Sequence, residues 1–340
     1  MKRILFYVHF NKNDELADYV IYQLRKIKNN FAKVVFITNS KICESDKKRL
    51  EGLYDEFISR KNEGFDFAAW RDGIVKIGWE YIVKYDSMVV MNDTCFGPIF
   101  DTESIFAKMD LRKNTDFWGI TNHKKHEKIN EHIQSYFMSF SSKVIKNKVF
   151  CEFWENIHNY TDVKKVIDNY ETKLTGILLT EGFSYATLIN SKKYKGKYNV
   201  IRPDGNLSEL YPIEIIGSNI PFVKIKSFKW VPTDKIIAKI RKVSDYPTKM
   251  IKDHLKNISL ITMDDNIYEV MENYREFIDH QEEVINDLKK HSNGLENQIH
   301  DLREYSNSIN IELERITNSF PQKTLRLLSN VCKPIYKRRK

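Results

Sequence analysis

Short apolar runs alternate with amphipathic segments through the first hundred residues of the chain. The apolar runs have the length and the β-branched or aromatic content of buried strands, while the segments between them carry apolar residues at helical spacing. Strands separated by helices of about 10–15 residues indicate a parallel sheet with helices on both faces. We therefore predict an α/β, Rossmann-like fold, with its first strands at residues 3–10, 33–39, 55–59 and 88–91.

The pattern is less regular between residues 114 and 215. Two further strands are predicted at residues 116–121 and 135–140, followed by a helix over residues 143–158. Beyond residue 232 the sequence mixes lysine with isoleucine, valine and leucine, which is typical of short helices. We therefore expect a first domain over residues 1–232 and a helical connector over residues 233–264.

From residue 265 the pattern changes to a heptad repeat that continues to residue 320. Apolar residues recur at alternating spacings of three and four, and no proline occurs between residues 248 and 320. An average spacing of 3.5 residues predicts a coiled coil, and isoleucine-rich a positions with leucine or isoleucine at d favour a parallel dimer. We therefore expect a long C-terminal coiled-coil helix that makes a homodimer.

Charge, cysteine spacing and the length of the apolar runs indicate which partners and which compartment to expect. The formal net charge of +9 favours anionic partners. The four cysteines show no C-x-x-C spacing, so neither a zinc site nor a disulfide framework is indicated, and a reducing cytoplasm fits best. No apolar run reaches the roughly 18 residues of a membrane-spanning helix, and the run at residues 4–8 is too short for a secretory signal.

The last twenty residues, 321–340, contain seven basic residues and no acidic residue, together with an apolar side. Such a basic amphipathic tail is predicted to dock peripherally on the anionic inner face of the cell membrane. A disordered basic end is the alternative. No RNA-recognition motif accompanies the charge, so we do not expect a nucleic-acid partner.

Polar side chains follow the apolar strand at residues 88–91. Asn92, Asp93 and Thr94 come directly after it, and Gly97 and Pro98 end the segment. Parallel α/β sheets bind ligands at the carboxyl ends of their strands. We therefore predict a ligand site at this edge of the sheet.

Five short motifs follow one another along the chain: Asn62-x-Gly64-x-Asp66, Asn92-Asp93-Thr94 with Gly97-Pro98, Tyr136 to Phe140, Glu171 through Gly182-Phe183, and Asn219 to Lys224. In this order they resemble the rhamnan synthesis protein F family, whose members are bacterial cell-surface polysaccharide glycosyltransferases of GT-A-like outline. The resemblance covers about residues 3–230. It implies inverting transfer of a sugar from a nucleotide sugar to a lipid-linked glycan of an O-antigen, capsule or rhamnan, with dTDP-rhamnose as the donor by analogy.

The resemblance also implies which residues bind the donor. In similar enzymes an Asn-x-Gly loop holds the nucleotide sugar, the end of the first strand contacts the base or ribose, and the fourth strand ends beside the diphosphate. The candidates here are His9, Asn62, Gly64, Asp66, Arg71, Asn92, Asp93 and Thr94. The stretch from Asn62 to Gly73 is expected to be a loop, and the alternative role for Asp66 is to cap the helix that follows it.

GT-A enzymes usually end the fourth strand with Asp-x-Asp, whose carboxylates hold Mg²⁺ or Mn²⁺ against the diphosphate. This chain offers one carboxylate, Asp93, as the candidate metal ligand. Divalent cations are often held by one or two carboxylates and substrate phosphates, so Mg²⁺ or Mn²⁺ is retained as a cofactor hypothesis. A metal-independent route that uses lysine, arginine or helix N-termini is the alternative.

The same resemblance implies a general base. Similar inverting enzymes carry Glu-Asp-x-Asp-Leu-Ser, and residues 170–175 align with it so that Glu171 takes the position of the usual base. Asp168 is the reserve candidate. The alternative is a first-turn helix acid with Asp168 as its cap partner. The incomplete Asp-x-Asp also keeps open a non-catalytic scaffold, a degenerate sugar-nucleotide fold that assembles partners through the coiled coil.

Overall fold

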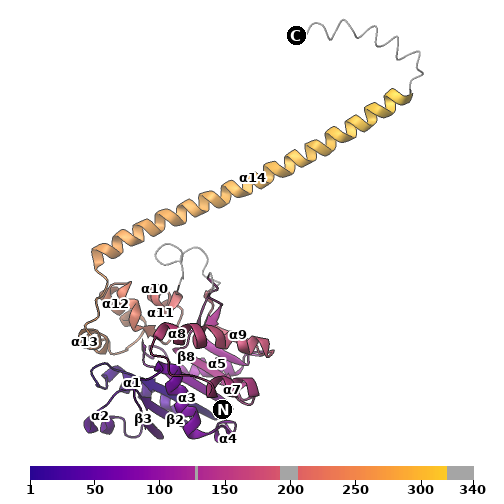
Figure 1. Cartoon of the computed structure of the whole chain (residues 1–340). Helices are drawn as coiled ribbons and strands as arrows, with labels where there is room; N and C mark the ends of the chain where they lie inside the picture. Colours follow the sequence, from indigo (N-terminus) through magenta and orange to yellow (C-terminus); the bar gives the residue numbers. More distant parts are fainter. Residues whose placement is uncertain (127–128, 192–205, 320–340) are drawn as a thin grey trace. The chain divides into compact units, whose positions relative to one another are not determined.

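The computed structural model describes residues 1–126, 129–191 and 206–319 (Figure 1). The chain divides into two compact units, Met1–Arg275 and Glu276–Lys340. The first unit contains the sheet and its helices. The second is helical as far as Ser319, and the predicted tail at residues 321–340 lies outside the described residues.

The first four strands of the sheet are parallel and lie in the order β3-β2-β1-β4. This order is that of a nucleotide-binding Rossmann half. Their carboxyl ends therefore meet at one edge, where Val8 of β1 is paired with both Ile37 and Asn92. The strands span β1 Arg3–His9, β2 Lys33–Thr38, β3 Glu56–Ser59 and β4 Ser87–Asn92.

The second half of the sheet is mixed. β8 (Phe137–Ser141) runs antiparallel to β4, and β6 (Phe117–His123) runs antiparallel to β8, so β6 has the direction of β4. β9 (Tyr185–Ile189) is parallel to β6, and the short β7 (His132–Ile133) is antiparallel to it. The prediction of an α/β fold with a mostly parallel sheet is confirmed.

Helices cover both faces of the sheet because alternate strand residues point to opposite faces. Leu5, Tyr7 and Val89 pack on one face with α1, α5, α11, α12 and α13, and Ile4, Phe6 and Val90 pack on the other with α3, α7 and α9. These helices span α1 Asp18–Ile27, α3 Phe65–Ile77, α5 Thr102–Asp110, α7 Lys148–Glu155, α9 Thr172–Thr180, α11 Pro212–Gly217, α12 Thr233–Val243 and α13 Lys249–Asn257.

Shorter elements complete the first unit. β5 pairs antiparallel with β10 in a two-stranded ribbon apart from the main sheet. The short elements are α2 Glu44–Arg49, α4 Trp79–Ile82, α6 Ser142–Ile145, α8 Val163–Val166, the π-helical turn η2 Ile167–Glu171, α10 Leu207–Leu210, the 3-10 helices η1 Lys28–Asn30 and η4 Ile225–Lys229, β5 Cys95–Phe96 and β10 Val223–Lys224. In the stretch predicted as a connector, α12 packs on α11 and α13 packs on α1.

Two local predictions were wrong. The expected loop from Asn62 to Gly73 is mostly helix, because α3 already begins at Phe65, directly after Gly64 with its positive φ of 75°. Phe67 and Trp70 of this helix are both buried and lie at helical spacing. The neighbouring turn-type residues Gly64 and Asp66 had favoured a loop instead. The expected single helix over residues 143–158 is divided into α6 and α7, since the Asn147 side chain caps α7 by accepting from the Phe150 N–H.

The long helix α14 (Asp265–Ser319) has 55 residues, which confirms the predicted C-terminal helix. From residue 281 to residue 316 its seam side chains are exposed, with Leu288 at 63% and Leu302 at 66%. Its pairing into a coiled coil stays a prediction, and the last seam residue, Phe320, lies outside the described residues. Among the helices described, none is both long enough and apolar enough to cross a membrane.

Candidate active site at the carboxyl edge of strand β4

A cavity of about 200 Å³ lies where β4 ends. Its wall combines the start of α3, the end of β4, the helix that contains η2, and the segment that follows β10. It brings together four of the predicted site residues: Asp66, Asn92, Thr94 and Glu171. A more open hollow of about 670 Å³ along α7 and α9 is lined by none of the candidates, so we take the smaller cavity as the site.

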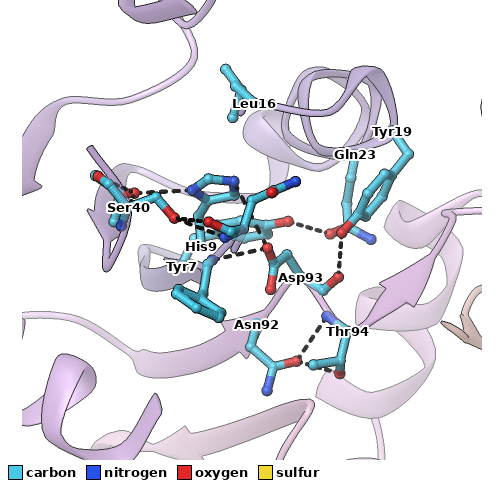
Figure 2. A network of polar contacts seen from close by, with 12 residues as sticks. Tyr7, His9, Leu16, Tyr19, Gln23, Ser40, Asn92, Asp93 and Thr94 are labelled. Carbon is cyan, nitrogen blue, oxygen red and sulfur yellow. Dashed lines mark hydrogen bonds and ion pairs between the residues drawn. The ribbon is translucent and has the colours of Figure 1, made fainter. Parts of the chain in front are cut away.

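The direction of each side chain decides which residues at the end of β4 reach the cavity. Asn92 and Thr94 line it, and they are joined because the Thr94 hydroxyl donates to Asn92 Oδ1 over 2.7 Å. Asp93 lies between them and points the other way, as Figure 2 shows. β4 ends at Asn92 and the chain bends at residues 93 and 94, an arrangement in which the Asp93 carboxylate does not line the cavity.

Asp66 carries the first carboxylate of the cavity. It lies in the first turn of α3 and accepts a hydrogen bond from Asn92 Nδ2 over 2.8 Å. Burial raises the pKa of Asp66 to about 6, and the nearby Glu171 carboxylate adds to the rise. The alternative of a capping role was wrong, because the N-cap residue of α3 is Gly64 and the Asp66 side chain bonds across to β4.

The raised pKa predicts that ionisation of Asp66 lowers the free energy of unfolding. The folded state holds the Asp66 proton more tightly than the unfolded state, where the ordinary pKa is 3.8, so stability is lost as the pH rises from about 4 through about 6. Asp66→Asn keeps an acceptor for Asn92 and removes the charge. We expect its free energy of unfolding to exceed that of the wild type by about 1–3 kcal/mol above pH 6 and to equal it near pH 3.5.

Urea unfolding at pH 3.5, 5, 6 and 8 measures this difference. Asp168→Asn is the matched control, because it removes a carboxylate that is exposed. A stability difference for Asp66→Asn that stays constant across the pH range would contradict the assignment.

Glu171 carries the second carboxylate. It is the last residue of the π-helical turn η2, within a helical run that begins two turns earlier, where Asp162 accepts from the Lys164 N–H. The first-turn alternative with Asp168 as cap partner was therefore wrong. Glu171 Oε1 accepts from the Ser135 N–H and hydroxyl, both over 2.9 Å, and Oε2 has no hydrogen-bond partner among the described residues. Asp168 itself is exposed and does not line the cavity.

His9 and Asp93 form a separate, buried polar group (Figure 2), and neither residue lines the cavity. Asp93 Oδ2 accepts from the Phe10 N–H over 3.0 Å and lies 4.0 Å from His9 Nε2, while His9 Nδ1 lies 3.0 Å from the Thr38 hydroxyl. Burial lowers the pKa of His9 to about 4 and raises that of Asp93 to about 8. The contacts of these two predicted donor-binding residues connect the ends of β1, β2 and β4.

The residues present do not fit a resident divalent cation at Asp93. Its carboxylate is turned to a backbone N–H and a histidine, and the two positions that face the cavity hold an amide and a hydroxyl. The described part of the chain contains no group of three or more histidine, cysteine, aspartate or glutamate side chains placed to hold a metal ion. Mg²⁺ and Mn²⁺ prefer carboxylate oxygens, and the end of β4 presents none of them to the cavity.

The remaining candidates do not reach the cavity. Arg71 donates to the Ile157 carbonyl and to Asn159 Oδ1, the latter over 3.0 Å. A Cβ at Gly64 would lie 2.9 Å from Asn159 Cα, so this glycine permits close approach of the chain's own backbone. Asn62 is exposed. The Asn-x-Gly motif thus positions α3, and through it Asp66.

Among the other lining residues that the site predictions missed are Ser135, Lys224 and Lys226, which carry a hydroxyl and two ammonium groups. Lys224 reaches it because β10 pairs with β5, which places Lys224 opposite Cys95, the residue after Thr94. Lys224 is the last residue of the fifth sequence motif, so this motif was the sequence signal that could have identified it. Its position depends on a pairing across more than a hundred residues, which no local pattern reveals.

Comparison with known proteins gives a family match for most of the chain. The family model described as rhamnan synthesis protein F matches residues 34–303. The chain belongs to the rhamnan synthesis protein F family. It is also similar to the uncharacterized protein y4gN of Sinorhizobium fredii, with 34% identity over 175 residues that cover 51% of this chain and 45% of that protein.

The virulence protein VirA of Vibrio anguillarum is 27% identical over 157 residues, which cover 45% of this rhamnan synthesis F family member and 47% of VirA. The chain thus spans about half the length of the curated relatives it matches. Among solved structures, the WbbM bifunctional glycosyltransferase aligns with 12% identity and a TM-score of 0.38, covering 74% of this chain and 51% of WbbM.

A 4-diphosphocytidyl-2C-methyl-D-erythritol synthase from Anaerococcus prevotii aligns with 10% identity and a TM-score of 0.34, covering 56% of this chain and 89% of the synthase. Both TM-scores are low, so the fold assignment rests on the strand order and register of this family member.

Proposed function

We propose that this member of the rhamnan synthesis protein F family is an inverting glycosyltransferase, with Glu171 as the general base. The observation that carries the proposal is the position of Glu171. Ser135 fixes one of its oxygens, and its other oxygen is left for a ligand in a cavity at the carboxyl edge of β4. This edge is where open α/β sheets bind their ligands.

The proposed reaction is a single displacement at the anomeric carbon. The acceptor hydroxyl oxygen forms a bond to that carbon while Glu171 takes the hydroxyl proton. The bond from the carbon to the phosphate oxygen breaks, and the electron pair leaves with the nucleoside diphosphate. A positioned base of this kind contributes about 10²–10⁴-fold to the rate.

The size of the cavity indicates which part of the donor it takes. Sites that bury a drug-sized ligand usually measure about 300–1,000 Å³, and this cavity measures about 200 Å³. It therefore suits a sugar ring with its adjoining phosphates better than a whole nucleotide sugar. We assign Asp66, Asn92 and Thr94 to the sugar hydroxyls, because carboxylate, amide and hydroxyl groups hydrogen-bond them well.

The identity of the partners follows by analogy with the family's name. We propose dTDP-rhamnose as the donor and a lipid-linked glycan of the cell surface as the acceptor. Such an acceptor would place the enzyme on the inner face of the cell membrane. The basic tail expected to dock there lies outside the described residues.

Calorimetric titration of the purified protein with dTDP-rhamnose, UDP-sugars and GDP-sugars tests the donor assignment. We expect saturable binding of one nucleotide class. Glu171→Gln should bind that donor within about threefold of the wild-type affinity, because the base acts on the acceptor. Folded protein that binds no nucleotide sugar would contradict the proposal.

We also propose that α14 makes a parallel homodimer through its heptad seam. Ile309 lies at a seam position and is 42% exposed, while Ile311 lies on the opposite side of the helix and is 67% exposed.

Because a charge at a d position is buried in the paired state, Ile309→Asp should convert the dimer to a monomer. Ile311→Asp makes the same chemical change outside the seam and should leave the dimer intact. Sedimentation equilibrium measures the oligomeric state of both variants. A wild-type chain that is monomeric at micromolar concentration would contradict the proposed dimer.

A further inference from the structure

We propose that Lys224 and Lys226, and not a divalent cation, neutralise the diphosphate leaving group of the donor. This inference rests on the proposed glycosyltransferase function and names the groups that stabilise charge in its transition state. The leaving diphosphate gains negative charge as its bond to the sugar breaks, so fixed positive charge beside it lowers the barrier.

The end of β4 supplies the first part of the argument. A pair of metal-binding carboxylates at the end of β4 would have to occupy positions whose side chains face the cavity. The two positions that face this cavity are Asn92 and Thr94, and neither carries a charge. Each is also engaged, since Asn92 Oδ1 accepts from Thr94 and Asn92 Nδ2 donates to Asp66.

The β5–β10 ribbon supplies the second part. Opposite the uncharged end of β4 it presents Lys224, whose ammonium lies 5.4 Å from the centre of the Tyr136 ring and forms an ion pair with the buried Glu209, 3.7 Å from its Oε1. The Lys224 side chain is only 15% exposed, so its charge is held in place before a ligand arrives. A preorganised cation of this kind needs no reorganisation when the leaving group forms.

Lys226 adds a second cation two residues further along. It lines the same cavity, is exposed, and makes no ion pair with a described residue. Lysine is a point charge on a flexible stem, which suits contact with phosphate oxygens that move as the bond breaks. The pair thus joins one fixed ammonium to one mobile ammonium at the mouth of the site.

The competing arrangement is a cation held by Asp66, Glu171 and the diphosphate together. Each carboxylate already has one oxygen occupied, Asp66 Oδ2 by Asn92 and Glu171 Oε1 by Ser135. Glu171 must also keep its other oxygen for the acceptor proton. The structure therefore favours lysine over metal, and the experiment below separates the two.

The test is calorimetric binding of dTDP, UDP and GDP to the full chain, in EDTA and in Mn²⁺, together with the rate of donor turnover. We expect one nucleoside diphosphate to bind in EDTA, with an affinity that Mn²⁺ changes by less than about twofold. Lys224→Met and Lys226→Met should each weaken that binding about tenfold and lower turnover at least as much. Lys229→Met is the matched control, because Lys229 is an exposed lysine of the same segment that does not line the cavity.

Two outcomes would overturn the inference while leaving the proposed function in place. One is binding and turnover that vanish in EDTA and return with Mn²⁺. The other is a pair of folded lysine variants that bind the nucleoside diphosphate as tightly as the wild type. Absence of binding and turnover under every condition would overturn the proposed function, and the inference with it.

Discussion

Replacing Glu171 by glutamine is expected to lower kcat by about 10²–10⁴-fold, because the amide cannot take the acceptor proton. Glutamine keeps the size of the side chain and an oxygen that accepts from Ser135, so the fold and the donor affinity should persist. The measurement is kcat with saturating donor and acceptor, together with thermal unfolding of both proteins. A variant that is folded and retains more than a tenth of the wild-type rate would exclude Glu171 as the base.

Asp168→Asn separates the two sequence candidates for the base. Asp168 lies only three residues from Glu171, but its carboxylate is exposed and outside the cavity lining. We expect kcat to change by less than about twofold. Glu155→Gln, which neutralises an exposed glutamate on α7, controls for the loss of one negative charge near the site.

Truncating Trp70 to alanine is expected to lower the free energy of unfolding by about 3–5 kcal/mol. This is a large part of the total free energy of unfolding, which is typically about 5–15 kcal/mol. Trp70 is fully buried in α3, where it packs against Phe67 and Trp154. Its Nε1–H donates to the Met91 carbonyl over 3.2 Å, at the residue before Asn92. The side chain therefore holds α3 against the end of β4, and urea unfolding measures the loss.

Two conservative variants separate packing from hydrogen bonding at this point. Trp70→Phe keeps an aromatic ring but leaves the buried Met91 carbonyl without its donor, which should add about 1–3 kcal/mol to the packing cost. Trp154 is equally buried, and its Nε1–H has no hydrogen-bond partner among the described residues. Trp154→Phe should therefore cost less than Trp70→Phe, and the reverse order would contradict the role given to Trp70.

The strands of the first half followed from the sequence because each is a short apolar run between polar turns. β1, β2 and β4 are buried along nearly their whole length, so their composition carries the signal. Helix α3 was placed too late because Gly64 and Asp66 resemble turn residues. In the structure the glycine begins the helix, and the aspartate bonds to Asn92 from its first turn.

Two cavity residues, Asn92 and Thr94, were predictable because they follow a strand, and two more, Asp66 and Glu171, because they belong to the family motifs. Asn92, Thr94, Asp66 and Glu171 were all candidates and meet in one cavity. Asp93 was assigned with its neighbours because the sequence does not show which way each side chain points where the chain bends after β4. Lys224, Lys226 and Ser135 also line the cavity, and they come from segments that only the folded chain brings to β4.

The most direct test of the account is the release of nucleoside diphosphate from dTDP-rhamnose, UDP-sugars and GDP-sugars in the presence of lipid-linked glycan acceptors. It should be measured for the wild type and for Glu171→Gln, with the anomeric configuration of the product determined by NMR. The account predicts release from one nucleotide class, a product of inverted configuration, and loss of both in the variant. Equal release by folded Glu171→Gln, or none from any donor by folded wild type, would contradict it.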